Sequence, residues 1–130
     1  MTDKRTILII DDDETLRESI ADLFRLSDFQ VLEAASGEQG LAMAQRQHPD
    51  IIISDLMLPG LDGVGVRKHL LQTPEGSIPF VFISAKADVH SILQENGLGQ
   101  EMFLPKPFDS LKLVEMVEQI LVHGGLDIQI

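Results

Sequence analysis

The sequence predicts an α/β fold: a doubly wound parallel sheet, built from five strand–helix units, with helices on both faces. Two observations predict this class. Short apolar runs rich in β-branched residues recur along the chain, as in parallel strands that are buried on both faces. Segments with apolar residues at helical spacing separate these runs, and right-handed crossovers turn that alternation into a three-layer sandwich. At 130 residues the chain has room for one domain.

The first two units each pair a short strand with an amphipathic helix. The apolar run 7–10 and the shorter run 29–33 are the expected strands. Asp13 is placed to cap the first helix, whose apolar face consists of Leu16, Ile20, Leu23 and Phe24. The second helix opens at Ser36-Gly37 and runs to about Gln47, because the His-Pro pair that follows stops it.

The third unit begins with the apolar run 51–54, which ends at Asp55. A dense turn signal occupies residues 58–63 and leads into a helix that carries Val66, Leu70 and Leu71. An exposed connection over 73–77 then leads to the fourth strand, expected from about Pro79 to Ser84.

The last two units contain the least regular helix. The fourth helix begins near Asp88 and is weak, because Asn96-Gly97-Leu98-Gly99 interrupts it. Pro105, at the end of strand 102–104, cannot donate a ladder hydrogen bond, so this strand belongs at a sheet edge beside the fourth strand. The final helix begins near Asp109, and His123-Gly124-Gly125 ends it.

The composition excludes several classes of function. Ten basic against 21 acidic residues give a formal net charge of −11, and no local basic patch offsets it, which disfavours nucleic acid and anionic membranes as partners. No apolar run approaches the length of a membrane span, and the first residues lead into a strand without a signal segment. The chain has no cysteine, which fits the cytoplasmic location that we expect.

Polar residues follow four of the apolar runs, where the predicted strands end. Asp11 and Asp12 follow the first, Asp55 the third, Ser84 the fourth and Lys106 the fifth. Because the carboxyl ends of parallel strands share one sheet edge, where ligands bind in open α/β folds, these side chains should meet. Three clustered carboxylates favour a hard divalent cation such as Mg²⁺, which takes oxygen ligands together with phosphate. No His or Cys lies nearby in the sequence to indicate zinc.

A carboxylate nucleophile accounts for the other groups of this predicted site. An aspartate can accept a phosphoryl group as an acyl phosphate, and a lysine and a hydroxyl can neutralise and position that group. Helix capping is the structural alternative, and it stays open for Asp13. Capping alone is a poor explanation for Asp11, Asp12 and Asp55 taken together.

Four motifs, in this order, resemble the receiver domain of bacterial two-component response regulators. They are ILIIDDDE at 7–14, DLMLPGLDG at 55–63, ISA at 83–85 and LPKPF at 104–108. The resemblance covers the whole chain and implies a flavodoxin-like (βα)5 sandwich with the parallel sheet order 2-1-3-4-5. It also implies a receiver domain over residues 1–123, with 124–130 as the start of a linker or C-terminal tail.

The resemblance implies a phosphoacceptor and a magnesium site. Asp55 looks like the residue that accepts the phosphoryl group. Asp12 would bind Mg²⁺ directly and Asp11 largely through water, while Asp55 and the backbone carbonyl of Met57 would complete the protein ligands.

The resemblance also implies a set of switch residues. Ser84 resembles the hydroxyl that follows the phosphoryl group, and Lys106 resembles the lysine that contacts it. The Lys106-Pro107 bond is expected to be cis, a state that only proline makes accessible at low cost. Phe103 stands at the position of a rotating aromatic residue, and a permanently buried core aromatic is an equally good interpretation.

By resemblance, the chain is a phosphorylation-dependent signalling switch. The added charge would draw Ser84 and Lys106 inward and remodel the face formed by the fourth helix, fifth strand and fifth helix. The expected partners are a sensor histidine kinase or phosphotransfer protein, an unidentified output domain or downstream protein, and a second copy in a phosphorylation-dependent homodimer. The chain is not expected to be a conventional enzyme, although it would catalyse its own phosphorylation and slow autodephosphorylation.

Two residues beside the predicted phosphoacceptor depart from the pattern of the family. Met57 is apolar two residues after Asp55, and Lys86 is basic two residues after Ser84. Both flank the path of a hydrolytic water, and an apolar side chain cannot orient water, so we expect an aspartyl phosphate that is not especially short-lived. No DNA-binding or catalytic output segment follows Val122, so a stand-alone receiver and the front of a longer regulator both stay open.

Three rival functions are weighed against this hypothesis. A pseudo-receiver that works only as a docking module would lack some of the site residues, yet all are present. A magnesium-dependent phosphatase with an aspartyl nucleophile would carry a second acid at the position of Met57. A dinucleotide-binding domain is disfavoured because aspartates, and not a glycine-rich loop, follow the first strand.

Overall fold

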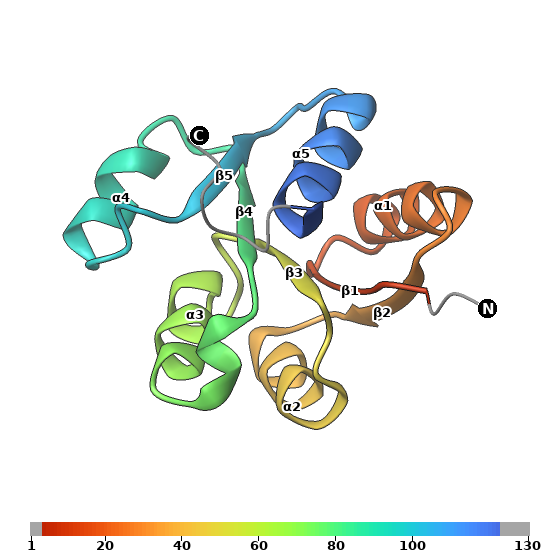
Figure 1. Ribbon diagram of the computed structural model, residues 1–130. Helices are drawn as coiled ribbons and strands as arrows, with labels where there is room; N and C mark the ends of the chain where they lie inside the picture. The colour runs from red at the N-terminus through yellow and green to blue at the C-terminus, as the bar shows by residue number, and fades with distance from the viewer. Residues whose placement is uncertain (1–3, 123–130) are drawn as a thin grey trace.

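A five-stranded parallel sheet lies between two layers of helices in the computed structural model, which describes residues 4–122 (Figure 1). The strands are β1 (Thr6–Ile10), β2 (Gln30–Ala34), β3 (Ile51–Asp55), β4 (Phe80–Ser84) and β5 (Met102–Pro105). Their order is β2-β1-β3-β4-β5, and each neighbouring pair is parallel. The predicted α/β class and sheet order are therefore confirmed, and β5 is an edge strand beside β4, as its terminal proline predicts.

Each face of the sheet has its own apolar core. Helices α1 (Glu14–Leu26) and α5 (Ser110–Val122) pack on one face, and α2 (Gly37–Gln47), α3 (Gly63–Leu71) and α4 (Val89–Glu95) pack on the other (Figure 1). Every residue of β3 and β4 is buried, because helices cover both faces of these central strands. This explains why their sequences are continuous apolar runs and not alternating ones.

Side chains cap the first three helices where the sequence predicts that these helices begin. Asp13 accepts a hydrogen bond from the Leu16 N–H, Ser36 accepts one from Gln39, and Asp62 accepts one from Gly65. Each bond satisfies an N–H group that has no partner within the first turn of its helix. The helix starts are thus confirmed, while β2 lies one residue later than the predicted 29–33.

The connection after α3 is more structured than the exposed loop that the sequence predicts. Pro74–Ser77 forms a short 3-10 helix, η1, and part of the segment is half-buried. The cause is Arg67, a buried side chain of α3 that donates to the carbonyl groups of Gly76 and Ile78 at 3.3 and 3.1 Å. The prediction missed it because an arginine in an amphipathic helix is usually exposed.

The same arginine also holds the start of β5. Its Nε lies 3.0 Å from Oε1 of Glu101, and its guanidinium carbon lies 5.2 Å from the centre of the Phe80 ring. The next residue, Lys68, donates to Oδ1 of Asn96 at 2.9 Å on the surface. Two adjacent cations of α3 therefore tie this helix to the segment between α4 and β5.

The fourth helix ends at Glu95, which confirms the predicted interruption at 96–99. Gly97 has a φ of 74°, a value that favours glycine, and the Leu98 N–H donates back to the Leu93 carbonyl at 2.7 Å. No helix among the described residues is long and apolar enough to cross a membrane. The predicted end of the last helix at 123–125 and the predicted linker at 124–130 lie outside the described residues.

We expect Arg67→Ala to lower the free energy of unfolding by about 2–3 kcal/mol, because it leaves Glu101 without its cation and two carbonyl groups without a donor. Lys68→Ala is the matched control on the same helix, and its exposed bond should contribute less than about 0.5 kcal/mol. Urea unfolding followed by circular dichroism measures both. Equal losses for the two variants would contradict this assignment.

Candidate functional site

Four strands deliver the predicted site residues to one edge of the sheet. Asp11 directly follows β1, and its N–H continues the ladder by donating to the Ala34 carbonyl at 3.1 Å. Asp55 is the last residue of β3 and pairs in register with Ile83, the neighbour of Ser84. Lys106 directly follows β5, and its N–H donates to the Ser84 carbonyl at 2.7 Å. The structure therefore brings together residues that are up to 95 positions apart.

One ammonium group joins two of the predicted carboxylates. Lys106 Nζ lies 2.8 Å from Oδ2 of Asp55 and 3.4 Å from Oδ2 of Asp11. Asp11 is fully buried and Asp55 is 9% exposed, so both carboxylates have given up most of their hydration. The ion pairs compensate for that loss, since an unpaired buried charge is strongly unfavourable. The Lys106-Pro107 peptide bond is cis, as the resemblance predicts.

Burial is the largest influence on the pKa of the Asp11 carboxyl, ahead of the charged groups around it. Loss of hydration raises the pKa of the Asp11 carboxyl above its ordinary value, and the nearby charge of Asp55 raises it further. The hydrogen bond from the Asp13 N–H and the charge of Lys106 oppose this rise without cancelling it. For Lys106, burial lowers the pKa, but the hydrogen bond to Asp55 and the attraction of both carboxylates outweigh it, so the net pKa is raised.

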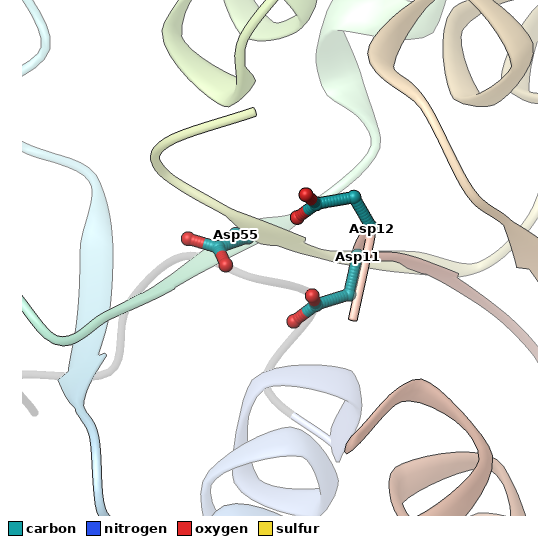
Figure 2. A group of neighbouring side chains, drawn as sticks. All are labelled: Asp11, Asp12 and Asp55. Atoms are coloured by element: carbon teal, nitrogen blue, oxygen red, sulfur yellow. The ribbon is translucent and has the colours of Figure 1, made fainter. Parts of the chain in front are cut away.

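Asp12 completes a group of three carboxylates (Figure 2). Oxygen atoms of Asp11, Asp12 and Asp55 lie within 4.8 Å of one another at the ends of β1 and β3. Asp12 is exposed whereas Asp11 is buried, so the group opens to solvent on one side. All of its donors are hard oxygen atoms, and this chemistry fits Mg²⁺, which binds through one or two carboxylates and keeps several waters.

Met57 and Ser84 lie next to this group in different ways. The Met57 N–H donates to Oδ1 of Asp55 at 3.1 Å, which orients the carboxylate, while the residue as a whole is 48% exposed. Ser84 is buried, and its Oγ accepts a hydrogen bond from the Lys86 N–H at 3.1 Å. The backbone that follows Asp55 thus orients its carboxylate, and the hydroxyl of Ser84 lies at the same sheet edge.

Phe103 lies across from Phe82 in the register of β4 and β5. It is half-buried and packs against the core under α2, α3 and α4. This position is intermediate between the two interpretations of the sequence, because the ring is neither free in solvent nor enclosed like Phe82.

Two glycines set the path of the loop after Asp55. A Cβ atom at Gly63 would overlap the backbone oxygen of Asp55, and a Cβ atom at Gly37 would overlap that of Leu61. The loop also receives support from α2, because Oε2 of Glu38 accepts a hydrogen bond from the Leu61 N–H at 3.2 Å. The turn signal at 58–63 predicts a loop here, but nothing in it indicates that α2 supports the loop.

Arg17 is a residue in contact with the acidic pair that sequence reasoning missed. Its Nη1 donates to the backbone carbonyl of Asp11 at 2.9 Å, and its Nε donates to Glu33 of β2 at 3.1 Å. The available signal is its position one turn into α1, three residues after the acidic run Asp11–Glu14. That signal is weak because most arginines on a helix are solvated.

Comparisons with known proteins agree with this architecture. The family model described as "Response regulator receiver domain" matches residues 7–118. A solved structure from Chloroflexus aurantiacus, described as that of a response regulator, is 34% identical with a TM-score of 0.83 and covers 92% of this chain and 99% of its own. A CheY-like receiver domain protein from Methanospirillum hungatei is 20% identical with a TM-score of 0.85, covers 94% and 97% respectively, and supports the fold alone.

Curated relatives are longer than this chain. The phosphate regulon transcriptional regulatory protein PhoB of Pseudomonas aeruginosa is 31% identical over 122 residues, which are 93% of this chain and 53% of PhoB. The chain spans about half the length of the curated relatives it matches.

We expect Asp11→Asn to raise the free energy of unfolding of the metal-free protein at neutral pH, because the amide removes the cost of burying a charge at this position. The folded-state pKa of Asp11 lies above its ordinary 3.8, so the folded protein holds this proton more tightly than the unfolded chain does. The free energy of unfolding of the wild type therefore falls as the pH rises from about 3.8 through the folded-state pKa. The amide cannot ionise, so its advantage should grow across that window.

Urea unfolding in acidic and in neutral buffer tests this expectation, with Asp12→Asn as the exposed control. Lys106 keeps Asp55 as a partner in the Asp11 variant. A variant that is less stable than the wild type at neutral pH would contradict the sign of the effect.

Proposed function

The chain belongs to the response regulator receiver domain family, and we propose that it is a phosphorylation-dependent signalling switch with Asp55 as its phosphoacceptor. One observation carries this proposal: Lys106 reaches Asp55 from another strand at 2.8 Å, beside two further carboxylates. An ammonium and a cation-binding acidic group on either side of a carboxylate can neutralise a phosphoryl group that arrives between them.

The proposed reaction is transfer from a phosphohistidine of a partner kinase or phosphotransfer protein. An Asp55 oxygen attacks phosphorus as the nitrogen–phosphorus bond breaks, and the imidazole leaves with the electron pair of that bond. The Met57 N–H holds one oxygen of Asp55 and Lys106 holds the other, so the carboxylate is oriented before the donor arrives. In this sense the chain catalyses its own phosphorylation without being a conventional enzyme.

Mg²⁺ would be held by Asp12 directly, by Asp11 largely through water, by Asp55, and by the backbone carbonyl of Met57. When bound, it supplies positive charge to the transferring phosphoryl oxygens. Asp11 is already buried and paired with Lys106, whereas Asp12 is exposed and is therefore the carboxylate best placed for direct binding.

The proposed switch uses the residues on the other side of Asp55. The new charge draws Ser84 and Lys106 toward the phosphoryl group. Ser84 is already committed to the Lys86 N–H, so its movement also displaces the start of the segment that leads to α4. Phe103 is half-buried beside α4 and turns inward as the face of α4, β5 and α5 is remodelled.

The output of this switch lies in other molecules or segments. We propose a sensor histidine kinase or phosphotransfer protein as donor, and an output domain or downstream protein as target. A phosphorylation-dependent homodimer through the remodelled face and a cytoplasmic location belong to the same proposal. Within it, residues 1–123 form the receiver, and 124–130 begin a linker or C-terminal tail.

Two other functions have less support. A pseudo-receiver that only docks partners does not require the acidic group, the acceptor and the lysine to converge, yet all of them meet at one sheet edge. A phosphatase with an aspartyl nucleophile would place a second acid two residues after Asp55, where Met57 stands.

We expect the wild type to incorporate radiolabelled phosphate from acetyl phosphate in the presence of Mg²⁺, and Asp55→Ala to incorporate none above background. Asp22→Ala, an exposed position on α1, is the control and should label like the wild type. Equal labelling of Asp55→Ala and wild type would remove Asp55 as the acceptor.

The side chain at position 57 should set the lifetime of the phosphorylated state. Met57 is half exposed beside the acceptor and cannot orient a water molecule, so the wild-type aspartyl phosphate should persist for minutes or longer. Met57→Asn, which can orient water, should accelerate decay by about tenfold, within the range of general acid–base assistance. Met57→Leu is the apolar control. Wild-type decay within seconds, or equal decay of the Asn and Leu variants, would refute this role.

A further inference from the structure

We propose that Arg17 is a positioning residue for the acidic pair, which it fixes by clamping the backbone carbonyl of Asp11. This inference rests on the proposed function. It adds to the metal site a residue that is not a ligand and lies outside all four sequence motifs. The observation is that Nη1 of Arg17 lies 2.9 Å from the Asp11 carbonyl oxygen while its Nε lies 3.1 Å from Oε1 of Glu33.

The clamp acts on the peptide that joins the two aspartates. A peptide unit is planar, so the carbonyl oxygen of Asp11, the nitrogen of Asp12 and both Cα atoms move together. The Asp11 N–H is held by the Ala34 carbonyl at 3.1 Å, and its carbonyl is held by Arg17. With both sides of Asp11 held, the direction in which the Asp12 side chain leaves the backbone is determined.

The guanidinium is itself held in place. Its side chain is only 14% exposed, and Glu33 projects from β2, which pairs with β1 in register through Ile9. Oε2 of Glu33 accepts a second hydrogen bond from Arg25 at 3.1 Å, which fixes the carboxylate that orients Arg17. The clamp therefore connects α1, β2 and the end of β1 through one planar group.

This geometry requires arginine and not lysine. Arg17 uses two different nitrogen atoms to reach acceptors on two segments at once, which the planar fork of a guanidinium permits. A lysine offers one nitrogen and would be drawn to the charged Glu33 in preference to the neutral carbonyl. Removal of the clamp leaves the Asp11 carbonyl without this donor and lets the peptide rotate, which disperses the positions of the Asp12 oxygens.

Arg25 provides a matched control. It lies on the same helix and contacts the same glutamate, yet its hydrogen bonds go to Asp22 and Glu33 and its side chain is 49% exposed. Substitutions of the two arginines thus remove the same charge and the same partner, but only one of them releases the Asp11 carbonyl.

The test compares Arg17→Met, Arg17→Lys and Arg25→Met in the full chain. Methionine keeps the apolar stem of arginine and removes its donors. Isothermal titration calorimetry with Mg²⁺ alone, without a phosphodonor, should show a Kd about tenfold higher for Arg17→Met than for the wild type. This is the size of effect seen when a group that holds a metal ligand in place is removed. Arg17→Lys should be intermediate, and Arg25→Met should stay within about twofold of the wild type, since it leaves the ligands in place. Acetyl phosphate labelling of Arg17→Met should be slow at low Mg²⁺ and recover at saturating Mg²⁺.

Each outcome decides the question. A Mg²⁺ Kd for Arg17→Met equal to that of Arg25→Met would overturn the proposal, even if thermal unfolding showed a loss of stability. If Arg17→Met does not fold, a wild-type Kd for Arg17→Lys would do the same. A wild-type chain that neither binds Mg²⁺ nor becomes labelled would instead refute the proposed function, so the two failures are distinguishable.

Discussion

The Lys106 ammonium is the interaction on which the arrangement of this site depends. Two carboxylates that have lost most of their water lie at one sheet edge, and Lys106 is the cation that contacts both. Burial and the nearby charge of Asp55 raise the pKa of Asp11, and the Lys106 ammonium opposes that rise by supplying a positive charge between the two carboxylates. In the proposed switch, this lysine orients the Asp55 carboxylate as the nucleophile, and the acidic group beside it would hold the divalent cation.

This interaction is possible only because the strands are parallel and ordered as they are. β1 and β3 are neighbours, so Asp11 and Asp55 lie side by side, and β4 separates β3 from the edge strand β5 that carries Lys106. Lys106 spans that separation while its backbone N–H stays bonded to the Ser84 carbonyl. Asp55, Ser84 and Lys106 therefore occupy three consecutive strand ends, and in the proposed switch the charge gained at Asp55 would act directly on the other two.

Much of this could be predicted from the sequence, because strand ends and buried strands leave strong local signals. The apolar runs before Asp11, Asp55 and Ser84 indicate both the sheet and the edge at which these residues meet. Side-chain contacts between different helices and strands leave no comparable pattern in the sequence. The sequence pattern of α3 predicts a solvent-exposed Arg67, but this residue is buried and pairs with Glu101. The sequence likewise predicts that Arg17 is a solvated helix residue. The packing of α1 beside β2 brings it to the Asp11 carbonyl.

The contacts at Gly37 and Gly63 show how little space surrounds the loop that follows Asp55. Main-chain atoms of α2 and of the start of α3 lie against its carbonyl groups so closely that neither glycine could carry even a methyl group without displacing backbone. Substitutions at outward-facing positions of this segment, such as Met57, are therefore sterically tolerated, whereas a different path of the chain is not. Proteins with this fold can therefore differ in the side chains of this loop while its backbone path stays the same.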